Sequence, residues 1–299
     1  MNIIKPFVKE IINATPGKKM EYCGRVCYKS DSNINDSSYI KFLQNIKKSG
    51  HTSVLEHERI CFEININYKI DVANTKHFNI TYGENEVYIS ANIRAWLQNI
   101  NSESIFYPFL KEVYPFLFEE ECLNEKLPFI RIVDINSEGL KENIKNDIFR
   151  YHTSRTFEIH GSRSFSHQAV RHRVFSFSQQ SQRYCNFSND KFGHSIDFIM
   201  PIIDDKKEFS SDIKDFIYNT YIKMFEESED NYFYLIKAGA RPEDARAVLP
   251  NAAATILVMT GTVEEWDSFF KLRCDEHAQR EIRDIANLIK GEIYKKWKN

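Results

Sequence analysis

Alternating apolar and polar residues predict two β-strands in this chain. Apolar side chains occupy every second position from Ile60 to Ile66, and a second alternating run extends over residues 153–159. A period of two places the apolar side chains on one face of a strand, so each strand is expected to cover part of a core. The first strand follows a polar connector at 51–57, and the second leads into a helix that begins at Ser162.

Apolar spacing of three and four residues predicts the helices. One helix is expected over 38–49, with Asp36 or Ser37 as its cap and Gly50 as its stop signal. A long amphipathic helix is expected over 211–237, where it ends before Gly239. Pro242 begins the next helix, because a missing N–H does no harm there. Two further helices are predicted over 263–272 and 275–294. The apolar residues of the long helix near one stripe are Ile213, Phe216, Ile217, Tyr221, Met224, Tyr232 and Leu235.

The middle of the chain, about 69–150, is less regular. Its pattern predicts a short strand over 87–90, a helix over 91–100, a strand over 129–135 and a helix over 137–148. Helical spacing over 104–121 is interrupted by Pro108 and Pro115. The chain is therefore a mixed α/β protein whose last third is rich in helices.

Composition limits the possible functions. The chain has 299 residues, of which 42% are hydrophobic and 27% charged, and 40 Lys and Arg balance 42 Asp and Glu to a net charge of −2. A near-neutral protein has no global field for a polyanion, so any nucleotide site must be local. No signal peptide is evident, and no apolar run approaches the roughly 20 residues of a membrane span. A cytoplasmic protein without a membrane partner is expected.

The six cysteines are scattered, without the paired spacing of a metal site. We expect buried free thiols in a reducing cytosol and no metal centre.

Candidate chemistry concentrates in residues 166–184, which read SHQAVRHRVFSFSQQSQRY. Three arginines, serines and glutamines stand here together, and guanidinium forks match phosphate oxygens bidentately. A solvated basic loop is the alternative. Apolar residues among the charges favour a buried segment that holds an anion: Ala169, Val170, Val174, Phe175 and Phe177.

Two other segments carry unusual polar residues. Arg273 and His277 are four positions apart, so both are expected on one side of a helix start. A surface helix with paired charges is the alternative for that segment. Arg246 stands beside apolar residues at a helix end, where an ion-pair role is the alternative.

The order of these segments resembles the flavin-dependent thymidylate synthases. Arg171-His172-Arg173, followed by Ser181 and then Arg183-Tyr184, is similar to the signature of that family. The connector at 51–57 and the segments SHQAVRHR, AGARPEDARAVLP and EEWDSFFKLRCDEHAQREIR are similar to other family segments in the same order. The resemblance covers 37–68 and 153–294. Five colinear segments are specific evidence, whereas a basic tripeptide alone is weak.

The resemblance implies an α/β (α+β) fold, with a mixed sheet core wrapped by long helices. Residues 1–299 then form a single domain with an inserted elaboration at about 69–150. That insertion is expected to lie on the outer surface. A lid or an oligomer contact is the alternative, with Arg94 and Trp96 as the first residues to test.

The implied reaction converts dUMP to dTMP. Methylenetetrahydrofolate donates the carbon, reduced FAD donates hydride and NADPH reduces the flavin again. The implied assembly is a homotetramer with shared active sites.

The resemblance also assigns site residues by position. Arg273 is expected to stabilise the negative charge that develops on the uracil ring. The expected dUMP contacts are Gln168, Arg171, Gln179, Gln180, Ser181, Gln182, Arg183, Arg246 and Arg273, with Gln180 and Gln182 contributing backbone. The expected FAD contacts are His51, Ser53, Arg171, His172, Arg173, Gln179, Thr262, Glu264, Ser268 and His277.

The sequence departs from the family pattern at several of these positions. Ser178 stands where the family often has Asn, and Gln179 where it often has Glu. Thr262 and Glu264 replace an Asn and a basic residue, and Glu264 cannot pair with a diphosphate. One alternative is therefore a flavin-binding protein of the same fold that lacks synthase activity. A nucleic-acid-binding module is less favoured, because the chain has no basic excess.

The residues offer no obvious protein nucleophile. Ser181 has no histidine–carboxylate relay in the sequence to activate it. Cys185 and Cys274 lie close to the proposed site in the sequence, but the resemblance gives neither a role. We interpret both as packing residues.

Overall fold

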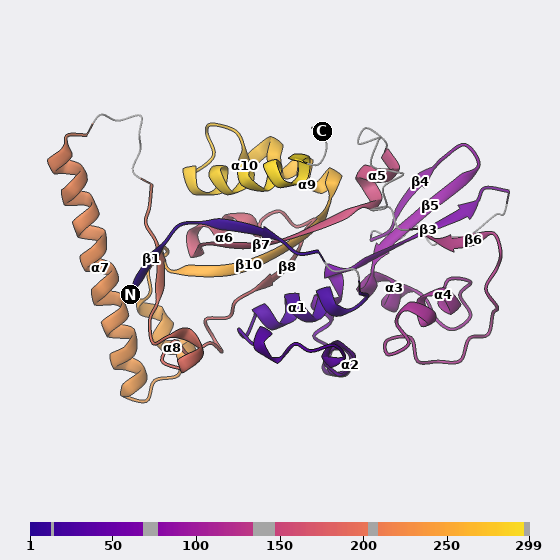
Figure 1. Ribbon diagram of the computed structural model, residues 1–299, viewed down its shortest axis with the longest axis horizontal. Helices are drawn as coiled ribbons and strands as arrows, with labels where there is room; N and C mark the ends of the chain where they lie inside the picture. The colour runs from indigo at the N-terminus through magenta and orange to yellow at the C-terminus, as the bar shows by residue number, and fades with distance from the viewer. Residues whose placement is uncertain (13–14, 68–76, 134–146, 203–208, 296–299) are drawn as a thin grey trace.

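The structure, a computed structural model, describes residues 1–12, 15–67, 77–133, 147–202 and 209–295. Its strands form three sheets, and helices cover both faces of the central one (Figure 1). The predicted α/β fold is confirmed. The strands are β1 (Asn2–Ile4), β2 (Phe7–Glu10), β3 (Arg59–Asn65), β4 (Asn79–Tyr82), β5 (Glu86–Asn92), β6 (Ile130–Ile132), β7 (Ser154–Ser162), β8 (Ser176–Gln179), β9 (Asp197–Ile199) and β10 (Ala254–Thr262).

Ten α-helices lie among the described residues, together with short 3-10 turns. The helices are α1 (Lys18–Val26), α2 (Ser38–Ser49), α3 (Ile93–Asn99), α4 (Tyr107–Val113), α5 (Asp147–His152), α6 (Arg163–Ala169), α7 (Ser211–Lys237), α8 (Pro242–Ala245), α9 (Val263–Arg273) and α10 (Arg280–Lys295).

The central sheet is antiparallel, with strand order β2-β7-β10-β8. On one face, α6, α9 and α10 bury a cluster that includes Phe157, Trp266 and Ile285. On the other face, α1 packs Val26 against Val258 of β10. Because β10 is covered on both faces, nearly all of its residues are buried, and its sequence shows no alternation of apolar and polar residues. The sequence pattern therefore missed the strand at the centre of the fold.

A second antiparallel sheet, β4-β5-β3-β6, lies beside the central one (Figure 1). It combines β3 with strands from the irregular middle of the chain. Helices α2, α3 and α4 close its core, in which Trp96 is fully buried next to Phe62. A third, two-stranded sheet pairs β1 with β9 in parallel.

Most regular predicted elements are confirmed. Helix α2 has the predicted bounds and ends at Gly50 with a left-handed φ of 75°, while α7 also has its predicted bounds. The helix expected over 104–121 is shorter, because α4 begins with Pro108 in its first turn and ends before Pro115. Most of the helix expected over 137–148 lies outside the described residues.

The prediction of a helix over 275–294 was wrong at its start. Helix α9 ends at Arg273, and α10 begins only at Arg280. The Asp275 carboxylate accepts a hydrogen bond from the backbone N–H of His277, and such a local turn competes with helix. Arg273 and His277 therefore do not share a helix face.

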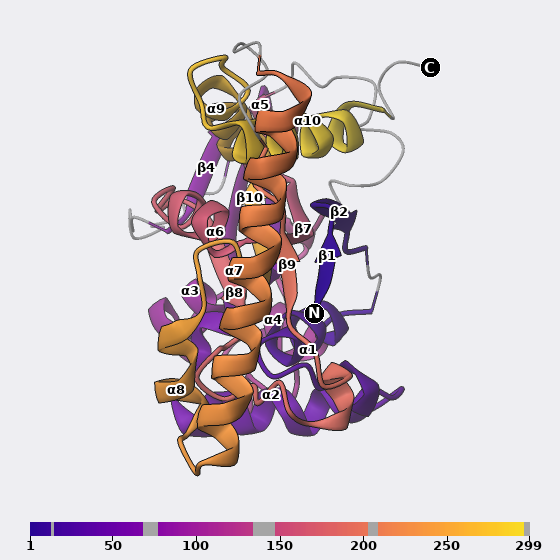
Figure 2. The same ribbon diagram turned by 90° about the vertical axis from the view of Figure 1, so that its left-hand side faces the viewer.

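The apolar stripe of α7 is largely exposed. This helix runs along one side of the molecule (Figure 2) and buries Phe225, Ser228 and Tyr232. Phe216 is 72% exposed and Met224 48% exposed. In one chain, α7 thus presents apolar surface to its surroundings.

Two further expectations about burial need correction. Val170 and Val174 are 40% and 60% exposed, because they stand in the turn after α6, whereas Ala169 and Phe175 are buried as expected. All six thiols are free, but Cys122 is exposed. None of the described helices is long and apolar enough to cross a membrane.

Candidate functional site

The basic segment at 166–184 is anchored by one aromatic ring. Phe175 packs on Trp266, with ring centroids 4.6 Å apart, and lies against Gly261 of β10. A Cβ at position 261 would come within 2.5 Å of the Phe175 ring, so only glycine permits this approach. Strand β8 then pairs with β10, which places Gln179 opposite Leu257. The polar residues on either side of Phe175 are held by the central sheet.

One cluster of cations forms at the end of α6. The Arg273 Nε donates a hydrogen bond to His172 Nε2 at 2.9 Å, and an amino group of the same guanidinium donates to the Gln168 carbonyl. His172 must therefore be neutral at Nε2. Burial and the Arg273 guanidinium lower the pKa of His172. Burial and then the charge of Arg171 lower the pKa of Arg273, so the two guanidinium groups lie close together.

A second cluster forms at the start of α6. Arg163 is half-buried, and burial followed by the charge of Arg246 lowers its pKa. The Arg246 Nε donates to the Glu243 carbonyl at 3.1 Å. Arg183 pairs with the Glu243 carboxylate at 2.6 Å. The sequence interpretation missed Arg163, although it directly follows Ser162, where the helix was predicted to begin.

Five arginines make up what we call the arginine ridge: Arg163, Arg171, Arg173, Arg246 and Arg273. Among the described residues, none of the five forms an ion pair with a carboxylate. Adjacent guanidinium groups without carboxylates repel each other unless an anion lies between them. The ridge therefore has the chemistry of a site for a phosphate-bearing ligand.

The polar residues after Phe177 are engaged mainly in the fold. The Gln179 amide donates to Thr255, and the backbone N–H groups of Gln180 and Ser181 donate to the carbonyls of Ile256 and Cys27. The Ser181 hydroxyl accepts from the backbone of Arg183. Gln182 is buried, and its amide nitrogen has no hydrogen-bond partner among the described residues.

The backbone N–H groups of Gln180 and Ser181 are therefore already used within the fold.

The connector, residues 51–57, is mostly a 3-10 turn whose inner side is buried. His51 and Ser53 are exposed, whereas Val54, Leu55 and His57 point inward. His57 bridges Thr260 at 2.7 Å and Ser178 at 2.9 Å. Through His57 the connector is thus bonded to β8, which belongs to the basic segment, and to β10, the strand next to β8 in the central sheet.

The remaining expected flavin residues lie apart from the ridge contacts. The Thr262 hydroxyl caps α9, and the Glu264 carboxylate pairs with Arg150. Ser268 and His277 are exposed, and the His277 ring is hydrogen-bonded to Asp275. Thr262 and Glu264 are thus committed to contacts within the fold.

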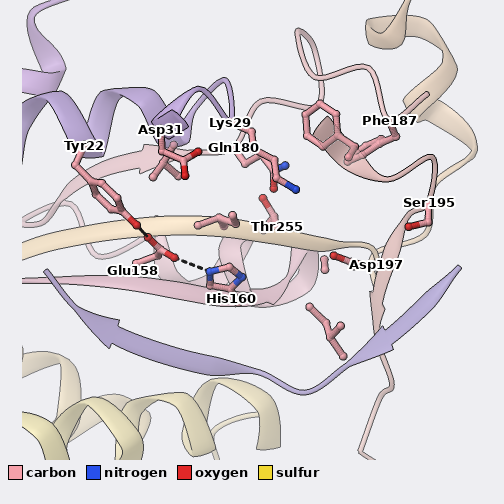
Figure 3. Close-up of a pocket in the computed structure, with 15 residues that line it drawn as sticks. Tyr22, Lys29, Asp31, Glu158, His160, Gln180, Phe187, Ser195, Asp197 and Thr255 are labelled. Atoms are coloured by element: carbon pink, nitrogen blue, oxygen red, sulfur yellow. Dashed lines mark hydrogen bonds and ion pairs between the residues drawn. The ribbon is translucent and has the colours of Figure 1, made fainter. Parts of the chain in front are cut away.

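A cavity of about 270 Å³ lies on the α1 face of the central sheet (Figure 3). Of the expected site residues, Gln180 lines it, and its amide points into the space. Tyr22 donates to Glu158, which also bonds to His160 at 2.7 Å. Burial raises the pKa of the Glu158 carboxyl, but the hydrogen bonds from His160 and Tyr22 outweigh this effect and hold that pKa below its usual value. This partly buried group of three side chains was not predicted.

A second cavity, of about 610 Å³, opens between α7 and the start of α10. Ser164 of α6 and Gln279 line it, and the Gln279 side chain accepts a hydrogen bond from Gln168. Two arginines, Arg280 and Arg283, and two glutamates, Glu276 and Glu281, also line this cavity, so its lining carries both charges.

Comparison with known proteins places these features in a family context. A family model described as thymidylate synthase complementing protein matches residues 10–77 and 147–297. The chain is 40% identical over 145 residues to the flavin-dependent thymidylate synthase of Geobacter sulfurreducens, which covers 47% of this chain and 58% of that protein. It is 35% identical over 193 residues to the one from Nitratidesulfovibrio vulgaris, covering 61% and 70%.

The chain is also 39% identical over 145 residues to the flavin-dependent thymidylate synthase of Thermococcus onnurineus, covering 48% of this chain and 56% of that protein. The matches thus span little more than half the length of the first relatives. Among solved structures, the UMP/dUMP methylase PolB from Streptomyces cacaoi aligns with 99% of this chain and 93% of its own, at 15% identity. The TM-score of this alignment is 0.46.

Proposed function

Because the chain belongs to the thymidylate synthase complementing protein family, we propose that it is a flavin-dependent thymidylate synthase. It methylates dUMP to dTMP, with methylenetetrahydrofolate as carbon donor, FAD as cofactor and NADPH as reductant. The observation that carries the proposal is the arginine ridge, whose cations lack carboxylate partners among the described residues. A dianionic phosphate and a flavin diphosphate are ligands of matching charge.

The two ends of α6 bind different parts of dUMP. Arg163 and Arg246 lie close together at its start and hold the phosphate, with Arg183 beside them. Arg171 and Arg273 lie at its end and face the uracil ring. Seven helical residues separate the ends, which is about 10 Å. A nucleoside monophosphate is of that length, so the spacing supports one ligand bound along α6. Gln168, Gln179, Gln180, Ser181 and Gln182 complete the dUMP site.

Arg273 supplies the electrostatic stabilisation. Its Nε is held by neutral His172, which fixes the plane of the guanidinium group. The remaining N–H groups of Arg273 face the developing negative charge on uracil. A fixed cation in a partly buried site stabilises such charge without reorganising at the moment of reaction. Ser181 positions the ligand and does not attack it.

The residues present also fit a flavin. Arg173 is exposed and has no carboxylate partner among the described residues, so it suits a diphosphate. The other proposed contacts are His51, Ser53, Arg171, His172, Gln179, Ser268 and His277. Thr262 and Glu264 contribute through the backbone, because their side chains are engaged in the fold. When bound, the flavin supplies the hydride.

The proposed assembly is a homotetramer of identical chains. Helix α7 leaves Phe216 and Met224 exposed along its length, and an apolar patch of this kind marks an interface. The arginine ridge and the connector are also open on one side in the single chain. A second copy would cover both the helix and the ligands, which supports active sites shared between subunits.

One set of assays tests the proposal. The protein is purified and examined for flavin absorbance, and dTMP is measured with dUMP, methylenetetrahydrofolate and NADPH present together or omitted in turn. Formation of dTMP only with all three supports the proposal. A flavin-bound protein that makes no dTMP would instead identify a flavoprotein without synthase activity. A colourless protein that binds single-stranded RNA would identify a nucleic-acid-binding module.

A further inference from the structure

The segment 78–146 has no counterpart in the matching family model, which ends at 77 and resumes at 147. Its described part, 78–133, contributes β4, β5, β6, α3 and α4. We call this part the inserted unit. It does not stand apart from the rest of the chain, because its apolar core is continuous with the connector. Val54 and Leu55 of the connector are buried in the same cluster as Trp96 and Leu110.

A salt bridge ties the outer side of the connector to the inserted unit. The guanidinium of Arg94, on α3, donates a hydrogen bond to the Glu56 carboxylate at 2.5 Å. Among the described residues, Glu56 has no other hydrogen-bond or ion-pair partner. Both side chains are partly buried, so the pair is less screened than a surface ion pair. Loss of Arg94 would leave Glu56 without a partner.

A second polar contact holds the residue that follows the connector. Tyr114, which is 2% exposed at the end of α4, faces Glu58: burial and then the Glu58 charge raise the pKa of Tyr114. Glu58 also accepts the backbone N–H of Gly17 at 2.9 Å, just before α1. A buried carboxylate needs such donors. The inserted unit therefore supplies a polar neighbour, Tyr114, to this buried carboxylate.

The opposite side of the connector is bonded to the central sheet through His57, Thr260 and Ser178. The connector thus lies between the central sheet and the inserted unit, and the inserted unit has no counterpart in the family model. We infer that the inserted unit is a positioning element, in which Arg94 and Tyr114 hold the connector so that His51 and Ser53 are preorganised for the flavin. This inference rests on the proposed function. Trp96 is fully buried in the core that the inserted unit shares with the connector.

Two substitutions and one matched control test this inference. Arg94→Gln removes the charge that pairs with Glu56, and Tyr114→Phe removes one hydroxyl without changing the packed ring. The control is Arg131→Gln. Arg131 is also an arginine of the inserted unit bonded to a glutamate on β3, through two hydrogen bonds of 2.7 Å to Glu63. Glu63 stands well along β3 from the connector, so this control loses a salt bridge without touching it.

Two quantities are measured in each variant: amide hydrogen exchange of residues 52–57 and the dissociation constants of FAD and dUMP. Arg94→Gln and Tyr114→Phe are expected to speed exchange in the connector and to raise the FAD dissociation constant about fivefold. The dUMP constant changes less than the FAD constant, and Arg131→Gln behaves as wild type. Arg94→Lys restores part of the FAD affinity, because it keeps the charge but not the forked geometry.

Unchanged exchange and unchanged FAD affinity in both variants would overturn the inference. Equal weakening by Arg131→Gln would overturn it too, since the effect would then be general destabilisation. A wild-type protein that binds no flavin would refute the proposed function instead. In that event, hydrogen exchange alone still decides whether the inserted unit holds the connector.

Discussion

Acid sensitivity centred on His57 is a sharp physical consequence of the fold. The imidazole is fully buried between Thr260 and Ser178, and burial, followed by the charge of Lys19, lowers its pKa from 6.5 to about 3. Below pH 6.5 the unfolded chain binds a proton at this position that the folded chain excludes. The folded state therefore loses stability as pH falls from 6.5 through the folded pKa of about 3.

The size of this effect follows from proton linkage. One excluded proton costs about 1.4 kcal/mol of unfolding free energy for each pH unit below 6.5. At pH 4.5, relative to a pH well above 6.5, His57 alone removes about 2.7 kcal/mol, out of a total that is typically about 5–15 kcal/mol. His152 is largely buried between Ser90 and Thr81, and burial followed by the charge of Arg59 likewise lowers its pKa to about 3. It adds a loss of the same order.

The test compares urea unfolding of wild type and His57→Gln at pH 7, 6, 5 and 4.5. Glutamine keeps a hydrogen-bonding group at this position but does not titrate. The variant is expected to be less stable than wild type at pH 7. As the pH falls, however, its unfolding free energy should decrease less steeply than that of wild type, because unfolding takes up about one proton fewer per molecule. Replacing the exposed His194 by Gln controls for the loss of any histidine. Parallel pH profiles for wild type and His57→Gln would refute the reasoning.

Three further outcomes are expected. Arg163→Gln should raise the KM for dUMP about tenfold, because a charged hydrogen bond to phosphate is lost; an unchanged KM in steady-state kinetics would contradict its role. Cys185→Ala and Cys274→Ala should keep dTMP formation largely intact, and loss of all turnover in either variant would make a thiol part of the chemistry. Phe216→Asp on α7 should dissociate the proposed tetramer in analytical ultracentrifugation, whereas an unchanged mass would place the interface elsewhere.

What the sequence determined by itself is local. Helix α2, helix α7 and strands β3 and β7 were predictable, because their spacing repeats within a few residues and their stop signals are adjacent. The ordered segments around Arg171 also sufficed to predict the family, which the family model confirms. The residue roles stay predictions. Strand β10 was not predicted, because it is buried on both faces and its apolar and polar residues therefore follow no regular period.

The tertiary structure alone decided which cations meet. Arg273 bonds to His172 across 101 positions, and Arg163 lies next to Arg246, whereas the apparent partner His277 turns away to Asp275. Spacing along a chain predicts neighbours only while one helix or strand continues. A turn such as the one after Arg273 ends that rule, and the packing of α6 against α9 and α10 then sets the arrangement. The arginine ridge is a product of that packing.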